Sequence, residues 1–270
     1  RRPMNVLSFA QQAWRARIFA FTLSERELRV RYKQALLGVA WAFIAPLSYV
    51  VIFTLVFDHT AKIETFNRPY PVFSYAALIP WGFFAQTIGR GTTAIVDNLV
   101  LLNKVSCPRE TFVFSAIATA FVDMLVSALA LPIVVLAFGE SFYGATIALV
   151  PILVLQLLAG AAIALLLSAL LMYVRDLRHL VPLGVQLLMF ATPVVWGLRA
   201  LEVRTSRTVL SLYAFANPFA TVCESYRRTL VYGQYPDWTL VGWSSLAVVI
   251  AFAFAYWVFK RLEPGFADVA

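Results

Sequence analysis

The chain has 270 residues, of which 61% are hydrophobic and only 13% carry a charged side chain, and its mean hydropathy is +0.78. A soluble protein of this length is roughly 45–50% apolar and about 25% charged, so one water-soluble core cannot hold this excess. The composition therefore excludes a soluble globular protein and predicts a membrane protein.

The first 35 residues form a basic segment with eight Arg or Lys side chains. They hold no short apolar stretch followed by a small-residue cleavage site, so we expect no cleavable signal peptide, and the missing initiator Met predicts that the sequence begins within a longer terminus. Trp14, Ile18 and Phe21 recur at helical spacing, while most cations fall on other faces. Residues 1–35 are therefore predicted to form an amphipathic helix at the lipid headgroups, although a plain positively charged anchor has the same pattern.

Six apolar runs follow, each of about 20 residues or more and therefore able to cross a hydrocarbon layer of ~30 Å at 1.5 Å per residue. They are 37–57, 72–96, 110–138, 143–174, 180–198 and 239–259. Between the last two, residues 199–238 are broken by Asn217-Pro218, Gly233 and Pro236 into pieces too short to cross, which is typical of re-entrant or interfacial helices. The predicted fold is all-α and polytopic, a single transmembrane domain over 1–270 with spans one to five in 37–198 and a tail at 260–270.

The cations of the loops predict the orientation. If the N-terminus is cytoplasmic, the cytoplasmic segments carry fifteen Lys or Arg side chains and the external segments seven. Cytoplasmic loops are enriched in cations, so both termini are predicted to be cytoplasmic. Cys107 then faces the cytoplasm and Cys223 the exterior, and we expect no disulfide between them.

Two ionisable side chains, Arg90 and Asp123, fall inside predicted spans. A charge within the membrane is costly and usually faces the bundle interior or water. The two side chains are therefore predicted to pair, either as a structural ion pair or with a role in transport.

The segment "SCPRET" predicts a helix that begins sharply on the cytoplasmic side. Pro108 suits the first helical position, and the negative charge of Glu110 suits the positive end of a helix. Such an element is either an efficient helix cap or a rigid contact for a partner protein.

Catalytic and nucleotide-binding patterns are missing from the sequence. The nearest approach to the phosphate-binding pattern G-x-x-x-x-G-K-[ST] begins at Gly139 and has Ala145 where Lys is required. The two histidines, His59 and His179, fall on opposite sides of the predicted membrane. We therefore expect no metal site, no catalytic residue and no cofactor in this chain, and no nucleic-acid partner.

Five short motifs occur in order along the chain. "RELRVRYKQALLGVAWAFIAPL" contains Arg26, Glu27, Leu28, Arg31, Tyr32, Leu37, Gly38, Trp41 and Pro46; "NLVLLNKVSCPRETF" contains Asn98, Lys104, Pro108, Arg109 and Glu110; "VRDLRHLVPLGVQLLMFATPVVW" contains Arg175, Asp176, Gln186, Pro193 and Val194. "NPFATVCESYRRTLVYGQYP" and "FKRLEPGFADVA" follow. Together they resemble the permease subunits of ABC transporters that export lipid-linked O-antigen or teichoic acid precursors. Cys107 departs from the resemblance, because the family usually has an aromatic residue there.

The resemblance implies a transport subunit rather than an enzyme. Its partners would be a second copy of the chain, two ATP-binding subunits that hold ATP and magnesium, membrane lipids and a lipid-linked polysaccharide, in a bacterial plasma membrane. It also implies that residues 199–238 hold external gate helices. The predicted contacts with the ATPase are Arg26, Glu27, Arg29, Arg31, Lys104 and Arg109.

An aromatic stripe is the candidate lining of the transport path. Tyr49, Phe53 and Phe57 recur at i, i+4 and i+8 and therefore share one helix face. The gate segment and the end of the fifth span add Trp196, Tyr213, Phe215, Phe219 and Tyr226. The alternative is ordinary packing, or the belt of aromatic residues found at membrane interfaces.

Two other functions fit the same composition. One is an ABC exporter permease for drugs or lipids. The other is a membrane-embedded glycan or acyl transferase, which needs a cluster of carboxylates or histidines that the sequence does not display.

Overall fold

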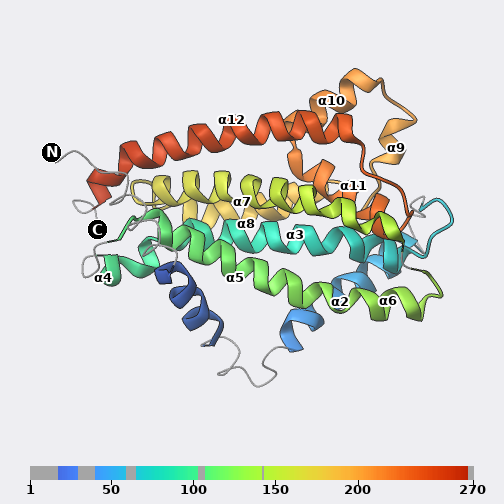
Figure 1. Ribbon diagram of the computed structural model, residues 1–270, viewed down its shortest axis with the longest axis horizontal. Helices are drawn as coiled ribbons and strands as arrows, with labels where there is room; N and C mark the ends of the chain where they lie inside the picture. The colour runs from blue at the N-terminus through green and yellow to red at the C-terminus, as the bar shows by residue number, and fades with distance from the viewer. Residues whose placement is uncertain (1–17, 30–39, 59–64, 103–106, 142, 267–270) are drawn as a thin grey trace.

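The computed structural model describes residues 18–29, 40–58, 65–102, 107–141 and 143–266, and every regular element in these ranges is helical (Figure 1). A first helix covers residues 18–29. The remaining helices are α2 (Trp41–Phe53), η2 (Thr54–Asp58), α3 (Tyr70–Thr93), η3 (Val96–Asn98), α4 (Leu99–Leu102), α5 (Glu110–Ala128), α6 (Leu131–Ala137), η4 (Gly144–Ala148), α7 (Leu149–Leu171), α8 (Leu177–Ala191), α9 (Arg199–Glu202), α10 (Arg207–Ala216), α11 (Pro218–Leu230), α12 (Trp238–Leu262) and η5 (Glu263–Gly265).

Three helical stretches of 28 residues are both long and apolar enough to cross a membrane: Glu110–Ala137, Gly144–Leu171 and Trp238–Gly265. They correspond to the third, fourth and sixth predicted spans. Two shorter apolar helices, Phe43–Phe57 and Leu177–Ala191, correspond to the first and fifth. The second is α3, which is long but more polar. The all-helical polytopic architecture is therefore confirmed, whereas the count of six spans stays a prediction.

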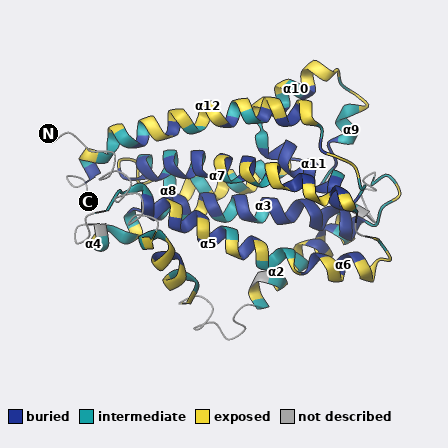
Figure 2. Cartoon of the chain, viewed as in Figure 1, coloured by how far each residue is buried: buried dark blue, intermediate teal, exposed yellow. Residues whose placement is uncertain are grey.

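Helix α3 is the central element of the bundle. It packs against α5, α7 and α11, and most of its side chains are buried (Figure 2). A helix that is covered by protein on most sides can carry polar residues, because neighbouring helices rather than lipid surround them. This explains why α3 is less apolar than α12, most of whose side chains are not covered by the rest of the chain.

Small residues allow α3 and α7 to approach closely. A Cβ atom added to Gly91 of α3 would lie only 2.6 Å from Cβ of Ala164 on α7. One added to Gly160 of α7 would lie 3.0 Å from the methyl group of Thr87 on α3. Membrane helices lack a hydrophobic driving force between them, so close backbone packing at small residues is a main source of their association.

Several predicted spans are broken or shorter than expected. The third predicted span is divided into α5 and α6 just before Pro132, and the first ends in the π-helix η2. The fifth ends at Ala191 rather than at residue 198, because Thr192 adopts an extended conformation (φ −98°, ψ 142°) directly before Pro193. A residue that precedes proline is disfavoured in the helical region, which accounts for the early end.

The first helix packs across the start of α5. The hydroxyl of Ser24 donates a hydrogen bond to the Ser115 carbonyl (3.0 Å), and the rings of Phe19 and Phe112 meet edge to face at 5.7 Å. Ile18 and Phe21 stay exposed on another face of the helix. An exposed apolar face on a basic helix is what an interfacial location requires.

The short helices α9, α10 and α11 lie together at one end of the bundle, opposite the end that holds α4 and η5 (Figure 1). Helix α11 begins at Pro218, whose fixed φ suits the first helical position, and it inserts among α3, α7 and α12. Most of its side chains are buried even though several are polar. Irregular and short helical segments at membrane depth are tolerated in such a protein-covered place.

Candidate functional site: an aromatic cavity

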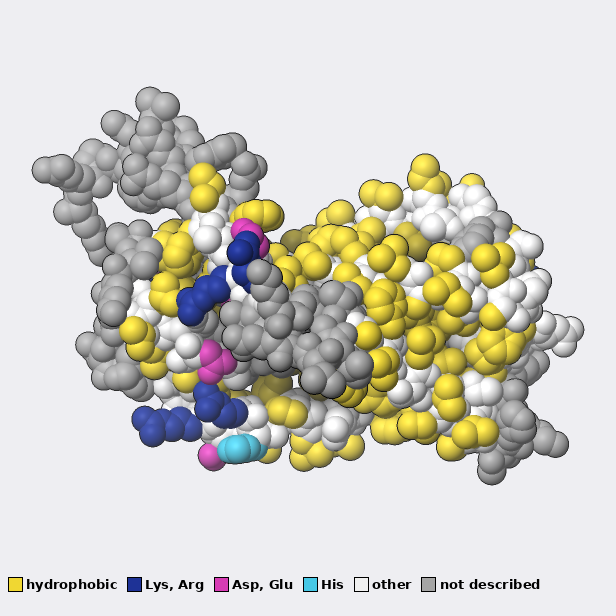
Figure 3. Space-filling view, turned by 90° about the horizontal axis from the view of Figure 1, so that it is seen from below, with side chains coloured by type: hydrophobic (Ala, Val, Ile, Leu, Met, Phe, Trp, Pro, Cys, Tyr) yellow, Lys and Arg dark blue, Asp and Glu magenta, His cyan; other side chains and the backbone are white. Residues whose placement is uncertain are grey.

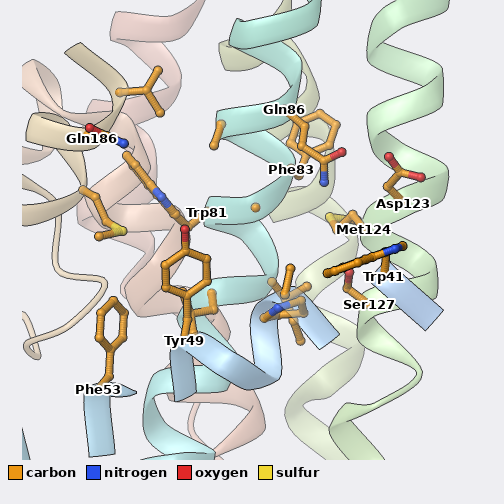
Figure 4. Close-up of a pocket in the computed structure, with 18 of the residues that line it drawn as sticks. Trp41, Tyr49, Phe53, Trp81, Phe83, Gln86, Asp123, Met124, Ser127 and Gln186 are labelled. Carbon is orange, nitrogen blue, oxygen red and sulfur yellow. The ribbon is translucent and has the colours of Figure 1, made fainter. Parts of the chain in front are cut away.

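A cavity of about 860 Å³ lies between α2, α3, α5 and α8, and its labelled side chains come from all four helices (Figure 4). Its size lies within the usual range for small-molecule sites, roughly 300–1,000 Å³. Because α2 and α8 are short and largely exposed, they form thin walls on the side away from the core.

Six aromatic side chains line the cavity. They are Trp41, Tyr49 and Phe53 on α2, Trp81 and Phe83 on α3, and Phe190 on α8. The rings of Tyr49 and Phe53 lie 5.8 Å apart, which is the spacing expected for residues one helical turn apart.

The predicted stripe reaches the cavity with two of its three members. Phe57 contacts Phe53, with ring centroids 5.8 Å apart, but it is absent from the cavity wall. It lies in the π-helix η2, where more residues per turn rotate the side chain away from the α-helical face.

Polar side chains also line the cavity: Gln86 and Arg90 on α3, Asp123 and Ser127 on α5, and Gln186 on α8, which lies across the cavity from Gln86 and Asp123 (Figure 4). Arg90 donates hydrogen bonds to Asp123 Oδ2 (2.9 Å) and to the Gln86 side-chain carbonyl (2.5 Å). The structure thus brings together the two charges that the sequence places inside spans. A charge-assisted pair of this kind offsets part of the cost of placing each charged group within the membrane.

The aromatic residues of the gate segment lie elsewhere. Phe219 and Tyr226 are buried in the core, where Phe219 packs on Phe84 and the Tyr226 hydroxyl lies 3.0 Å from the Gln156 side-chain carbonyl. These two residues are not part of the wall of this cavity, because α11 turns them inward toward α3 and α7.

Trp196 and Tyr213 instead bind the end of α8. The Trp196 indole donates to the Phe190 carbonyl (3.1 Å), and the Tyr213 hydroxyl donates to the Ala191 carbonyl (2.6 Å). They satisfy carbonyls that a helix leaves free at its C-terminus. Phe215 is half-exposed on α10 and is not part of the cavity wall.

Basic side chains gather at the end of the bundle that carries the first helix (Figure 3). Arg26 and Arg29 are exposed there, and Arg29 pairs with Glu25 at 2.5 Å. Glu27 accepts a hydrogen bond of 3.2 Å from the Thr119 hydroxyl, so it contacts α5. Of the other predicted docking residues, Arg31 and Lys104 lie outside the described residues.

Arg109 is engaged by the C-terminal end of the chain. Its guanidinium donates to the Glu263 carbonyl and lies 5.6 Å from the centre of the Phe266 ring. Beside it, Lys260 pairs with Glu110 at 2.8 Å and with Glu263 at 3.0 Å. Sequence reasoning missed this cluster, although each of the two motifs that meet here, "NLVLLNKVSCPRETF" and "FKRLEPGFADVA", contains an acidic residue beside basic ones.

The start of α12 is fixed by Asp237. Its carboxylate accepts hydrogen bonds from the amides of Thr239 (3.1 Å) and Leu240 (3.3 Å) and pairs with Arg207 at 2.5 Å. Burial alone raises the pKa of this carboxyl, but the hydrogen bonds from Arg207 and Leu240 and the Arg207 charge outweigh it and hold the pKa below its usual range. Asp237 is therefore a charged N-cap at ordinary pH.

Within the described ranges, no group of three or more His, Cys, Asp or Glu side chains is arranged to hold a metal ion. The free thiols of Cys107 and Cys223 lie in different parts of the molecule, half-buried and buried respectively. The cavity offers aromatic rings, side-chain amides and one ion pair, a combination that suits the binding of a partly polar small molecule.

The helices and their apolar spans are those of a polytopic membrane protein. The chain belongs to the ABC-2 type transporter family, whose family model matches residues 19–231.

Three relatives span different shares of the chain. An O-antigen export system permease protein RfbA from Myxococcus xanthus is 28% identical over 265 residues, which is 97% of this chain and 99% of that protein. The protein of the same name from Klebsiella pneumoniae is 23% identical over 255 residues, 92% of this chain and 93% of that protein. The polysialic acid transport protein KpsM from Escherichia coli is 30% identical over 118 residues, 43% of this chain and 45% of that protein.

Proposed function

We propose that the chain is the membrane-spanning permease subunit of an ATP-driven exporter that moves a lipid-linked polysaccharide, such as O-antigen, teichoic acid or a related surface glycan, out of the cytoplasm. Membership of the ABC-2 type family and the likeness, over nearly the whole chain, to proteins named O-antigen export permeases support the proposal.

The single observation that carries the proposal is the composition of the cavity. Sugars present apolar C–H faces that lie well on aromatic rings, and Tyr49, Phe53 and Trp81 supply such rings. Gln86 and Gln186 supply donors and acceptors for hydroxyl groups. A conduit must bind weakly at several places so that its cargo can leave, and aromatic rings with neutral amides meet that requirement.

ATP hydrolysis is assigned to a separate ATP-binding subunit, which would hold ATP and magnesium. The exposed basic side chains Arg26 and Arg29 of the first helix are its proposed contacts, together with Glu27, Arg31, Lys104 and Arg109. Of these, Arg109 would act mainly by holding η5 in place, since its guanidinium is already bound to the Glu263 carbonyl.

We further propose that two copies of the chain assemble with two ATP-binding subunits in the bacterial plasma membrane, with both termini cytoplasmic. The clustering of exposed cations at the end that carries the first helix supports this orientation. The Arg90–Asp123 pair is proposed to be structural, since each group neutralises the other beside the cavity.

The test replaces the α2 rings of the cavity in the native host. Tyr49→Leu combined with Phe53→Leu keeps apolar bulk for packing but removes both rings. We expect wild-type amounts of protein in the membrane and a loss of most surface glycan, whereas Phe254→Leu, an exposed ring on α12, leaves export unchanged. Normal export by the double variant would place the transport path outside this cavity.

A further inference from the structure

The side chain of Arg227 on α11 is completely buried, and it lies against carbonyl groups rather than in a close ion pair. The guanidinium donates to the carbonyls of Pro193 (2.5 Å), Trp196 (2.8 Å) and Val194, all in the segment that follows α8. Its Nε donates to the Phe73 carbonyl on α3 (3.2 Å), and the Phe73 ring centre lies 3.9 Å from the guanidinium carbon.

The nearest carboxylate is too distant to explain this placement. Glu224 lies 3.8 Å from Arg227, beyond hydrogen-bond range, and accepts instead from the Leu198 amide at 3.2 Å. Burying a guanidinium is costly unless its N–H groups find acceptors. The carbonyls of Phe73, Pro193, Val194 and Trp196 and the face of the Phe73 ring supply that compensation. We call these four carbonyls the cradle; they and the arginine depend on each other.

The cradle exists because α8 ends early. The chain leaves the helix at Thr192, and the carbonyls of 193, 194 and 196 then point away from any continuing helical turn. Unpaired backbone groups are tolerated at membrane depth only where other groups satisfy them. Arg227 satisfies three of them with one side chain and ties the same segment to α3.

Helix α8 needs such an attachment. None of its fifteen side chains is buried, yet Val185, Gln186, Met189 and Phe190 form one wall of the cavity. By contrast, Thr192, Val194, Val195 and Leu198, which follow directly, are all buried. The segment that follows the C-terminal end of α8 is thus buried in the protein, whereas the helix itself lies on the surface.

We propose that Arg227 is a positioning residue that fixes the C-terminal end of α8 to α3 and α11. Through that end it also fixes the wall of the cavity that α8 forms. Other side chains each add a single hydrogen bond to this segment: Tyr213 and Asn217 at Ala191 and Thr192, Tyr70 of α3 at the Val195 carbonyl (2.9 Å), and Glu224 of α11 at the Leu198 amide. Arg227 makes three hydrogen bonds to the segment and a fourth to α3. The attachment itself does not depend on the proposed function; its consequence for export does.

Lysine cannot replace this arginine. Its ammonium is a compact point charge on a flexible stem, whereas the planar guanidinium reaches acceptors on several sides at once. Arg227→Lys therefore keeps the charge and loses most of the cradle. Arg228→Lys is the matched control, because Arg228 is the next residue on α11, pairs with Glu202 at 2.6 Å and makes no bond to the α8 segment.

The experiment measures distances between pairs of spin labels attached to introduced cysteines in the full chain in detergent. Cys107→Ser and Cys223→Ala remove the native thiols, and an excess of unlabelled chain suppresses distances between labels on different copies. One pair joins exposed positions on α8 and α12, Leu187 and Val249; the reference pair joins Leu125 on α5 to Val249. In Arg227→Lys we expect a broadened Leu187–Val249 distribution and an unchanged Leu125–Val249 distribution, with neither altered in Arg228→Lys.

Three results would overturn the proposal. If both distributions stay narrow in Arg227→Lys, something else fixes α8. If both broaden, Arg227 supports the whole fold rather than this wall. If Arg227→Lys does not accumulate, Arg227→Gln is measured in the same way, because it leaves no unpaired cation in the protein. If neither variant accumulates while Arg228→Lys does, Arg227 again supports the whole fold rather than this wall.

Discussion

Replacing Gly91 with alanine tests the close contact between α3 and α7. The new Cβ would lie 2.6 Å from Cβ of Ala164, closer than any real pair of side-chain carbons, so one helix must shift. Overpacking of this kind costs about 1–3 kcal/mol. Against it stands the gain from replacing glycine within a helix, about 0.5–1 kcal/mol. The steric cost is the larger effect, and we expect Gly91→Ala to be destabilised.

Gly89 provides a matched control on the same helix. A Cβ added there meets nothing within 4 Å, so Gly89→Ala has the helical gain without the clash. The two variants should therefore differ by the steric term, about 1–3 kcal/mol, or about 2–4 °C of midpoint for each kcal/mol. Thermal unfolding of the purified protein in one detergent measures the difference.

A rescue variant separates this contact from other effects of the mutation. Ala164→Gly removes the atom that the new Cβ meets, so Gly91→Ala combined with Ala164→Gly should recover most of the lost midpoint. Equal midpoints for Gly91→Ala and Gly89→Ala, or no recovery in the double variant, would show that α3 and α7 are not packed at this distance.

Three further predictions concern charges. Asp123→Ala leaves Arg90 without its carboxylate and should lower the free energy of unfolding, measured by thermal unfolding, by about 1–3 kcal/mol. This is less than the roughly 3–5 kcal/mol lost when a fully buried pair is broken, because 28% of the Arg90 side chain is exposed. Asp123→Asn should be less destabilising than Asp123→Ala. Because the pKa of Asp237 is depressed in the folded protein, the charged carboxylate stabilises the fold above the ordinary aspartate pKa, and this stabilisation is lost as the pH falls through the pKa of the folded state. Asp237→Asn should therefore have a lower melting midpoint than wild type at pH 7, and the two midpoints should converge in acid. A gap between their midpoints that does not narrow would contradict this assignment. Arg26→Glu with Arg29→Glu should reduce co-purification of the ATP-binding subunit without lowering membrane insertion, and unchanged co-purification would make these cations lipid contacts only.

Hydrophobic patterning predicted most of the architecture. Long apolar runs at 110–138, 143–174 and 239–259 are helical almost throughout, because any backbone in lipid must satisfy its own hydrogen bonds. The broken segment 199–238 predicted short helices, and α9, α10 and α11 are there. The early end of α8 had a signal in Pro193, but a run of apolar residues continues past it.

Side-chain placement was harder to predict, for physical reasons. An aromatic residue that packs in a core and one that faces a cavity look alike in the sequence, so Phe219 could not be distinguished from Tyr49. The rotation of Phe57 depends on one π-turn that leaves no clear pattern in the sequence. Arg227 lies in a predicted external segment, where an arginine is normally solvated, and only the fold shows that carbonyls surround it.

The most direct test of the proposed function is transport by purified components. The chain and its co-purifying ATP-binding subunit are reconstituted in vesicles whose outer leaflet carries the lipid-linked glycan, and the glycan that becomes protected inside is measured. With the ATP-binding subunits on the outside of the vesicles, export moves the glycan into the vesicle interior. We expect the glycan to accumulate there only when both subunits, ATP and magnesium are present, and most of this accumulation to be lost when Tyr49→Leu and Phe53→Leu are combined. Glycan movement by the chain alone, or equal movement without ATP, would contradict an ATP-driven permease.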